Sequence, residues 1–430
     1  MPDRTIAPPI KNATDFRFEL PAIQRYTLRN GVPVYALNAG EEEVVQIEWI
    51  FKAGNSFEQK PMVAAATNFM LRNGTKTMSA LEINEHFDYY GSHLNRNCFN
   101  ETSNVTLHGL VKYLPELLPV VKELFIHSVF PQEEIDIFVQ NSVHRLKVNL
   151  LKCDFVANRE ADILLYGEGH PYGRCTRRED LEALERDDLI LFYDQFYRQG
   201  ALAIFIAGKL PDAWAEMLDT WFGELDVQPA MFPKIPAMEF APLQQTGKRI
   251  EMINDSKGVQ GAIRIIRNFP NRQHEDFAKV QVLNALYGGF FGSRLMSNIR
   301  EDKGYTYGIY SYLANYVEQS AWMVSTEAGR DVVDATIAEI YAEMEKLKVE
   351  AVDEEELQLV RNYLLGSVLG SLDGPFQVIN RWKGYILHGD PEGEYFYKAI
   401  DIIRHISAEE LKELARKYLN REDFYELVVV

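Results

Sequence analysis

The most distinctive segment of this chain is GGFFGSRLMSNIREDKGYTYGIYSYL, residues 288–313. Two glycines follow a predicted helix, a short amphipathic helical segment comes next, and alternating aromatic residues after Gly304 predict a strand. The charged residues REDK separate the short helix from the strand. Helix and strand in such close succession are typical of an α+β unit.

Two side chains of this segment have chemical potential. Arg300 and Tyr307 place a guanidinium and a phenol on a loop beside a strand. Together they are able to hydrogen-bond a carbonyl and to stabilise a developing oxyanion. Packing is the alternative, and the more common role of aromatic-rich turns, with the tyrosines lining the faces of a sheet.

The second half of the chain repeats the first. The helical segment VDEEELQLVRNYLLGSVLG (352–370) matches PQEEIDIFVQNSVHRLKVN (131–149), and each is followed at similar spacing by a helix and a buried strand that match as well. A helix at 277–288 is the counterpart of one at 60–73. Agreement in the same order indicates duplication of one unit of about 200 residues.

A proline-rich segment separates the halves. QPAMFPKIPAMEFAP (228–242) contains four prolines, which resist both helix and central strand. We predict an N-terminal domain over residues 1–225, a linker over 226–247 and a C-terminal domain over 248–430. Each domain is expected to be α+β, with a mixed or antiparallel sheet covered by helices.

Composition excludes several classes of partner. The chain has 430 residues, 47% hydrophobic and 25% charged, with a formal net charge of -18. A polyanion of this size is repelled by phosphate backbones and anionic lipid, so we expect neither nucleic acid nor membrane as a partner. Three cysteines without a CxxC pair, no signal peptide and no apolar run of about 20 residues predict a cytoplasmic protein.

The histidines predict no metal site. None of the nine lies in HxxEH, HExxH or HxxxH, so no two share a helical face at the i,i+4 spacing that zinc ligation needs. Neither a GxSxG elbow nor a phosphate-binding loop is present. We therefore expect no cofactor in this chain.

The segment 288–311 resembles the C-terminal domain signature of the pitrilysin (insulinase-like) zinc peptidases, which include the mitochondrial processing peptidase type. The resemblance extends to the duplicated halves, the linker, HPYGR (170–174) and NGTKTMSALEINEHFDYYGSHL (73–94). It implies the LuxS/MPP-like metallohydrolase fold. It also implies an N-terminal zinc site built on HxxEH, followed by a Gly-Thr pair.

Aligned on Gly74-Thr75, the resemblance places the zinc motif at Ala65, Asn68 and Phe69. None of these residues is a zinc ligand or a general base, and residues 138–153, where the family's third ligand lies, contain no carboxylate. The chain alone is therefore expected to be inactive as a zinc peptidase.

The family's C-terminal domain supplies an arginine and a tyrosine in the pattern RxxxxxxY, which Arg300 and Tyr307 match. Some members divide the zinc motif and this pair between two chains. The resemblance thus implies a substrate-binding subunit that pairs with a homologous, HxxEH-bearing partner, in which the zinc is expected, and that encloses unfolded peptides.

Two alternatives remain open from the sequence. In the first alternative, the chain is a structural or peptide-binding homologue without a peptidase partner, as some inactive relatives of the family are. Alternatively, it would be a peptidase with unorthodox ligands, which metal analysis of the isolated chain tests.

Overall fold

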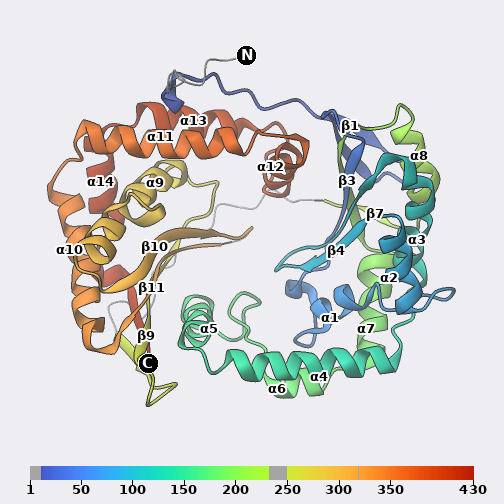
Figure 1. The fold of residues 1–430 in the computed structure, drawn as a ribbon, viewed down its shortest axis with the longest axis horizontal. Coiled ribbons are helices and arrows are strands. Elements are labelled where there is room, and N and C mark those ends of the chain that lie inside the picture. Colours follow the sequence, from blue (N-terminus) through green and yellow to red (C-terminus); the bar gives the residue numbers. More distant parts are fainter. Residues whose placement is uncertain (1–10, 232–248, 318) are drawn as a thin grey trace, which may run out of the picture.

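The computed structural model describes residues 11–231, 249–317 and 319–430, and it contains two β-sheets that face each other across the centre of the molecule (Figure 1). Strands before residue 231 form one sheet and strands after residue 249 form the other. Helices cover the outer faces of both sheets, which gives the molecule two comparable halves (Figure 1).

The first sheet has seven strands in the order β1-β2-β6-β3-β5-β4, with β7 beside β6. The pairs β2/β6 and β6/β7 are parallel, and the others are antiparallel. The sheet is therefore mixed, as expected. Its strands are β1 Gln24–Thr27, β2 Pro33–Asn38, β3 Val44–Phe51, β4 His93–Cys98, β5 Ser103–Leu110, β6 Ala201–Gly208 and β7 Gln228–Pro229.

The second sheet has five strands in the order β10-β11-β9-β12-β8. This order repeats β4-β5-β3-β6-β2 of the first sheet, and β8 pairs with β12 in parallel just as β2 pairs with β6. The common topology confirms the predicted duplication. The strands are β8 Arg249–Met252, β9 Gln260–Phe269, β10 Thr306–Asn315, β11 Ser320–Gly329 and β12 Tyr425–Val429.

The helices follow the same repeat, so that α1, α4 and α5 correspond to α9, α11 and α12. Local signals fix several of their ends: Ser79 with Glu82, and Ser407 with Glu410, form capping boxes at the starts of α2 and α14. The helices of the first half are α1 Val63–Met70, α2 Ala80–Tyr89, α3 Leu114–His127, α4 Gln132–Asn149, α5 Cys153–Tyr166, α6 Arg178–Glu182, α7 Arg186–Tyr193 and α8 Trp214–Phe222. Those of the second are α9 Phe277–Asn284, α10 Val333–Val349, α11 Glu354–Gly370, α12 Pro375–Leu387, α13 Glu394–His405 and α14 Ala408–Tyr418.

One helix of each half packs on the sheet of the other half. Val156, Ala157, Ala161 and Leu165 of α5 pack in one apolar cluster with strands β9, β11 and β12 of the second sheet. In the mirrored arrangement, α12 contacts β2 and β6 of the first sheet. Burial of a Val- or Leu-sized side chain contributes about 1.5–3 kcal/mol, so the exchanged helices join the halves through continuous apolar cores.

Side chains alternate along β6, so this one strand contributes to two apolar cores, one on each face of the sheet. Leu202, Ile204 and Ile206 of β6 belong to the core of the first half. Ala203 and Phe205 of β6, together with Ile50 of β3, which pairs with Ala203, belong to the core that contains α12. Successive side chains of a strand point to opposite faces, so a central strand that is buried on both faces is apolar throughout.

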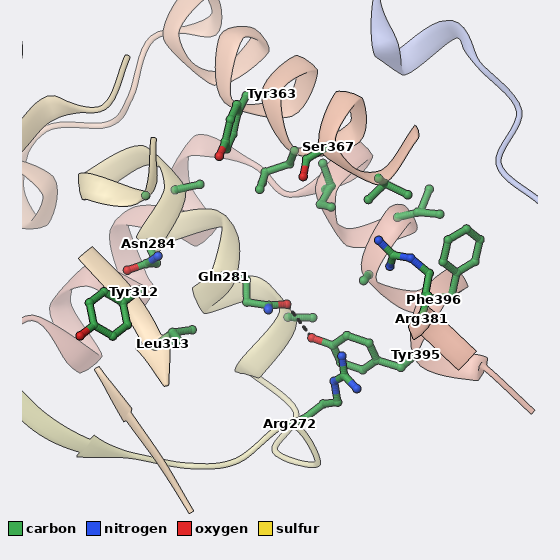
Figure 2. A pocket seen from close by; sticks show the side chains of 18 of the residues that line it. Arg272, Gln281, Asn284, Tyr312, Leu313, Tyr363, Ser367, Arg381, Tyr395 and Phe396 are labelled. Atoms are coloured by element: carbon green, nitrogen blue, oxygen red, sulfur yellow. Dashed lines mark hydrogen bonds between the residues drawn. The ribbon is translucent and has the colours of Figure 1, made fainter. Parts of the chain in front are cut away.

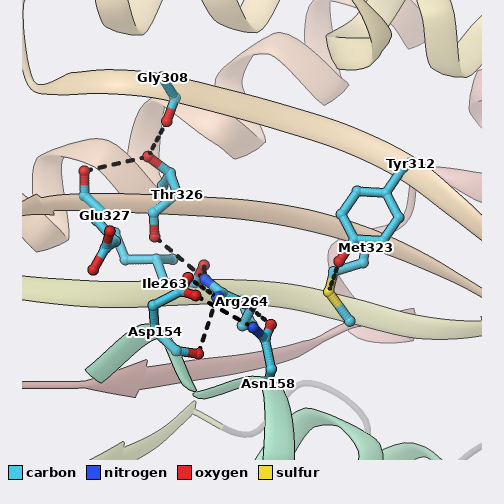
Figure 3. A network of polar contacts seen from close by, with 9 residues as sticks. All are labelled: Asp154, Asn158, Ile263, Arg264, Gly308, Tyr312, Met323, Thr326 and Glu327. Carbon is cyan, nitrogen blue, oxygen red and sulfur yellow. Dashed lines mark hydrogen bonds and ion pairs between the residues drawn. The ribbon is translucent and has the colours of Figure 1, made fainter. Parts of the chain in front are cut away.

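An ion pair with one buried member lies at each of the two contacts between α5 or α12 and the sheet of the other half. Glu48 of β3 is 2% exposed, and its carboxylate accepts hydrogen bonds from Nζ of Lys383 on α12 at 2.9 and 2.7 Å. In the second sheet, the fully buried Arg264 of β9 pairs with Asp154 of α5, and its Nε donates to Asn158 at 2.9 Å (Figure 3). Both pairs are satisfied on the inner face of a sheet, which fixes the exchanged helices in register.

One expectation about local structure is corrected. The Asn30-Gly31 pair between two β-rich runs predicts a type I′ turn, but the turn between β1 and β2 is not type I′, because only Gly31 (φ +86°), and not Asn30, is left-handed. Leu28 N–H donates to the Val32 carbonyl and Gly31 N–H to the Leu28 carbonyl, which makes it a three-residue loop that ends in a left-handed glycine. The segment predicted as linker begins with strand β7, and its residues 232–247 lie outside the described residues.

No helix within the described residues is both long enough and apolar enough to span a bilayer.

Candidate functional site

The positions aligned with the zinc motif lie on helix α1, and each has a packing role. Asn68 is 2% exposed, and its Nδ2 donates to the Asn104 carbonyl and to the Tyr197 hydroxyl, at 3.2 and 3.1 Å. Ala65 is half-buried and Phe69 is 42% exposed. Asn68 is therefore held by structural hydrogen bonds at the position where the family motif has its base.

Aromatic and cationic side chains gather beside Phe69. Its ring centroid lies 5.0 Å from that of Phe138 on α4, and the Arg96 guanidinium of β4 lies 4.9 Å from the Phe69 ring centre. Arg96 also donates to the Phe69 carbonyl. Helices α1 and α4 are thus joined by a ring contact at the place where the family's ligand residues would converge.

The charges around this cluster oppose a metal ion. Burial, reinforced by the neighbouring Arg72, lowers the pKa of Arg96 to about 10, which leaves it cationic at neutral pH. A divalent cation beside a guanidinium and without anionic ligands is destabilised. Among the described residues, no group of three His, Cys, Asp or Glu is placed to hold a metal. The residues present therefore do not fit zinc.

The isolated chain is expected to contain far less than one zinc per molecule after dialysis, because Ala65 and Phe69 offer no ligand atom and Arg96 adds a positive charge. Elemental analysis of the purified protein by mass spectrometry measures this. One tightly held zinc per chain that is displaced by substitutions on α1 would contradict the assignment.

The start of α1 is anchored by a buried carboxylate. Oε2 of Glu58 accepts a hydrogen bond from Ala64 N–H at 2.9 Å, and Arg174 of the HPYGR segment lies 3.8 Å from its Oε1. In the same segment, the Tyr172 ring packs against Tyr316 of the second half, with centroids 4.8 Å apart. Through these contacts, the HPYGR loop links the start of α1 to the second half of the molecule.

Burial raises the pKa of Glu58 to about 7, against the opposing effects of hydrogen bonds from Ala64 and Met62 and of Arg174. The folded state thus binds this proton more tightly than the unfolded chain, in which the pKa is near 4.5. The stabilisation is complete below pH 4.5 and is lost as the pH rises to about 7.

We expect the stability of the wild type relative to Glu58→Gln to fall as the pH rises from 4.5 to 7, measured by urea unfolding. Glu82→Gln is the control of opposite sign, because hydrogen bonds from Ser79 lower the pKa of Glu82. Relative to that variant, the wild type is expected to lose stability only as the pH falls below the ordinary carboxyl range. Parallel pH profiles of wild type and Glu58→Gln would show that Glu58 titrates normally.

Arg300 and Tyr307 meet at the start of strand β10. Arg300 lies in the last turn of the π-helical segment Met296–Asp302. Its Nε donates a hydrogen bond to the Tyr307 carbonyl at 2.8 Å. The Tyr307 side chain is 93% exposed. Within the described part of the chain, no hydrogen bond engages the Tyr307 hydroxyl or the Nη atoms of Arg300. Both polar groups are thus free for a ligand while the backbone around them is held.

Two further residues of the distinctive segment set this geometry. A Cβ on Gly288 would lie 2.7 Å from Cβ of Ser311, so glycine lets the preceding turn pack directly on β10. Phe291 is exposed and lies under the Arg300 guanidinium, 4.6 Å from its ring centre. Phe291 was not predicted from the sequence as part of the pair, although it lies in the same segment.

The Arg300/Tyr307 pair and the α1 positions belong to opposite halves of the molecule (Figure 1). The pair lies at β10, an edge strand of the second sheet, and α1 lies beside β4, the corresponding edge of the first sheet. The sequence therefore identified two separate places, one that does not fit zinc and one that places a half-buried guanidinium beside an exposed phenol.

Comparison with known proteins explains this combination. A family model described as "Peptidase M16 inactive domain" matches residues 183–364, a range that contains Arg300 and Tyr307. "Uncharacterized zinc protease YmxG" of Bacillus subtilis is 25% identical over 411 residues, which cover 94% of this chain and 97% of that protein. The chain is thus similar to peptidases of the M16 family over nearly its whole length. This confirms the resemblance to the pitrilysin/insulinase-like peptidases.

The other matches of this M16 homologue agree. "Non-peptidase homolog YmxG" of Helicobacter pylori is 22% identical over 336 residues, 75% of this chain and 74% of that protein. The crystal structure of a peptidase M16 inactive domain from Pseudomonas fluorescens has a TM-score of 0.83 at 20% identity and covers 95% of this chain and 98% of that one. The expected fold is confirmed.

Proposed function

We propose that this M16 homologue is the non-catalytic, substrate-binding subunit of a heterodimeric zinc peptidase. The observation that carries the proposal is the Arg300/Tyr307 pair, a half-buried guanidinium held through its Nε beside an exposed phenol, in a chain whose own α1 positions do not fit zinc. A homologous partner with an HxxEH motif would supply the zinc-bound nucleophile. This chain would supply the groups that bind the peptide.

The chemistry asked of the pair is electrostatic. The Nη atoms of Arg300 and the hydroxyl of Tyr307 would donate hydrogen bonds to the carbonyl oxygen of the peptide, where negative charge develops during hydrolysis. The fixed Nε contact of Arg300 limits the freedom of its guanidinium, so little reorganisation accompanies binding. Such donors stabilise the transition state more than the bound peptide.

An unfolded peptide is the substrate that the exposed sheet edges favour. Strands β4 and β10 are the edge strands of their sheets, and β10 begins at the Arg300/Tyr307 pair. An extended peptide is able to pair with such an edge through its backbone, with little regard to side chains. The net charge of -18 adds an attraction for basic peptides.

The experiment that tests the proposal is reconstitution. The chain is expressed together with an HxxEH-bearing M16 homologue encoded beside it, and hydrolysis of an unstructured basic peptide is measured for each chain and for the pair. Activity of the pair that far exceeds that of either chain is expected. Equal activity with and without this chain would overturn the proposal.

A structural homologue without a peptidase partner is the second candidate, and it is favoured by the name of the Helicobacter pylori relative, a non-peptidase homologue. Under this function, the chain would form stable complexes or bind peptides, yet it would add no activity to any zinc-bearing homologue. Co-purification from the native source, followed by identification of the bound chains, separates the two candidates.

A further inference from the structure

The second half contains a pocket of about 350 Å³ bordered by helices α9, α11, α12 and α13 and by strand β10 (Figure 2). Three of the elements that border the pocket have counterparts in the first half, since α9, β10 and α11 correspond to α1, β4 and α4. On the first-half elements, Phe69, Arg96 and Phe138 contact one another. On the second-half elements, the pocket lies between the helices and the strand.

Two arginines line one end of the pocket, around the ring of Tyr395 (Figure 2). The lining contains no aspartate or glutamate, and within the described residues neither Arg272 nor Arg381 forms an ion pair with a carboxylate. Two unneutralised guanidiniums in one pocket are unusual in a chain with a net charge of -18. The pocket is therefore locally positive in an acidic protein.

Both guanidiniums are held in place and retain donor capacity. Arg272 lies 4.5 Å from the Tyr395 ring centre and 5.1 Å from that of Tyr385, and its Nη1 donates to the Gly384 carbonyl. Arg381 donates through Nη1 to the Tyr385 hydroxyl at 2.9 Å and through Nη2 to the Ser371 hydroxyl. Each Nη atom carries a second N–H, and in the described structure the Nε of each arginine has no acceptor. Guanidiniums that are fixed in this way and keep further N–H groups are suited to bind an anion.

The rest of the lining favours an organic anion over a fully hydrated inorganic one. Away from the arginines, the wall combines apolar side chains with polar ones such as Gln281, Asn284 and Ser367, and a strongly hydrated ion such as phosphate would lose hydration against the apolar part. An organic ligand with a carboxylate on an apolar body would match both the arginines and the apolar side chains of the wall. The apolar part of the wall consists of Leu313, Leu364, Val368, Ile400 and Ile403.

We propose that this pocket is a binding site for a carboxylate-bearing organic ligand, with Arg272 and Arg381 as the carboxylate-binding residues. The carboxylate would come either from the C-terminus of a peptide or from a free small acid. The site does not depend on the proposed peptidase partner, because all of its residues lie in this chain.

The test is calorimetric titration of the full chain with three probes: acetyl-tetraalanine with a free C-terminus, the same peptide as its C-terminal amide, and succinate. Binding of the free acid, with the amide at least about ten-fold weaker, identifies a peptide terminus. Binding of succinate alone identifies a free small acid. Binding of neither carboxylate at 20 mM, roughly the weakest affinity that would matter for a ligand, overturns the proposal, as does equal binding of acid and amide.

Variants locate the site. Arg381→Gln and Arg272→Gln are each expected to weaken carboxylate binding about ten-fold or more, the loss of one charge-assisted contact. Arg404→Gln is the matched control, because Arg404 also has an unpartnered Nε but does not line the pocket. Ser367→Phe fills the pocket from an exposed position and keeps both arginines, so it tests the site even if an arginine variant does not fold. Unchanged binding in Ser367→Phe and in the folded arginine variants would place the ligand elsewhere.

Discussion

Tyr307→Phe is expected to lower kcat of the reconstituted heterodimer by about 10²-fold or more, with a much smaller change in KM. The substitution removes one hydroxyl from a side chain that is 93% exposed and makes no hydrogen bond within the described structure, so the fold has no reason to change. Loss of one donor to a developing oxyanion typically reduces kcat by about 10²–10³-fold. A fall in kcat with little change in KM is the signature of a contact made in the transition state.

Arg300→Ala is expected to have an effect of at least that size, and guanidinium added to the assay should restore part of the activity. Tyr310→Phe is the matched control, since Tyr310 is an exposed tyrosine of the same strand outside the RxxxxxxY pattern. Its kcat should stay within a factor of two, roughly the effect of a surface substitution. Wild-type turnover in both Tyr307→Phe and Arg300→Ala would remove the pair from the mechanism, even if the heterodimer itself were active.

Lys383→Met is expected to destabilise the chain by about 3–5 kcal/mol, because it leaves the Glu48 carboxylate buried without its cation. Glu48 is 2% exposed and receives both of the Lys383 contacts, while Asn104 donates to the same carboxylate. The loss should be seen as a lower urea midpoint with an unchanged denaturant slope.

The double variant Lys383→Met, Glu48→Gln separates charge from packing. The glutamine keeps an acceptor for Asn104 and removes the buried charge, so most of the lost stability should return. Lys398→Met on neighbouring α13 is the control for losing an exposed lysine, with an expected change within about 0.5 kcal/mol. If Lys383→Met and Lys398→Met unfold alike, the cross-half ion pair does not stabilise the protein.

Much of the fold follows from local patterns in the sequence. Helix α4 begins directly after Pro131, and strand β6 spans the apolar run ALAIFIAG, as the sequence predicts. These signals act over one or two helical turns or along a single strand. The turn at Asn30-Gly31 was predicted wrongly because an Asn-Gly pair fits several hairpin loops, and the hydrogen bonds of the flanking residues select among them.

For the candidate sites too, residues within one short segment were found from the sequence, whereas contacts between distant segments were missed. Arg300 and Tyr307 were identified because both lie in one short segment that resembles the family signature. In the structure the two residues meet at the start of β10. Arg96 and Phe138 were missed, although they contact Phe69. They come from β4 and α4, and no local pattern shows that two such elements meet.

By itself, the sequence determined that the chain is a duplicated α+β unit, that the zinc-motif positions lack ligand atoms, and that an Arg/Tyr pair is retained. These are properties of residue identity and of short-range periodicity. Only the tertiary structure decided that α5 and α12 each pack on the sheet of the other half, that Glu48 meets Lys383, and that the second half contains a pocket lined by two arginines. The physical reason is that these contacts join residues far apart in the chain, and which apolar face covers which sheet is settled only when both halves pack together.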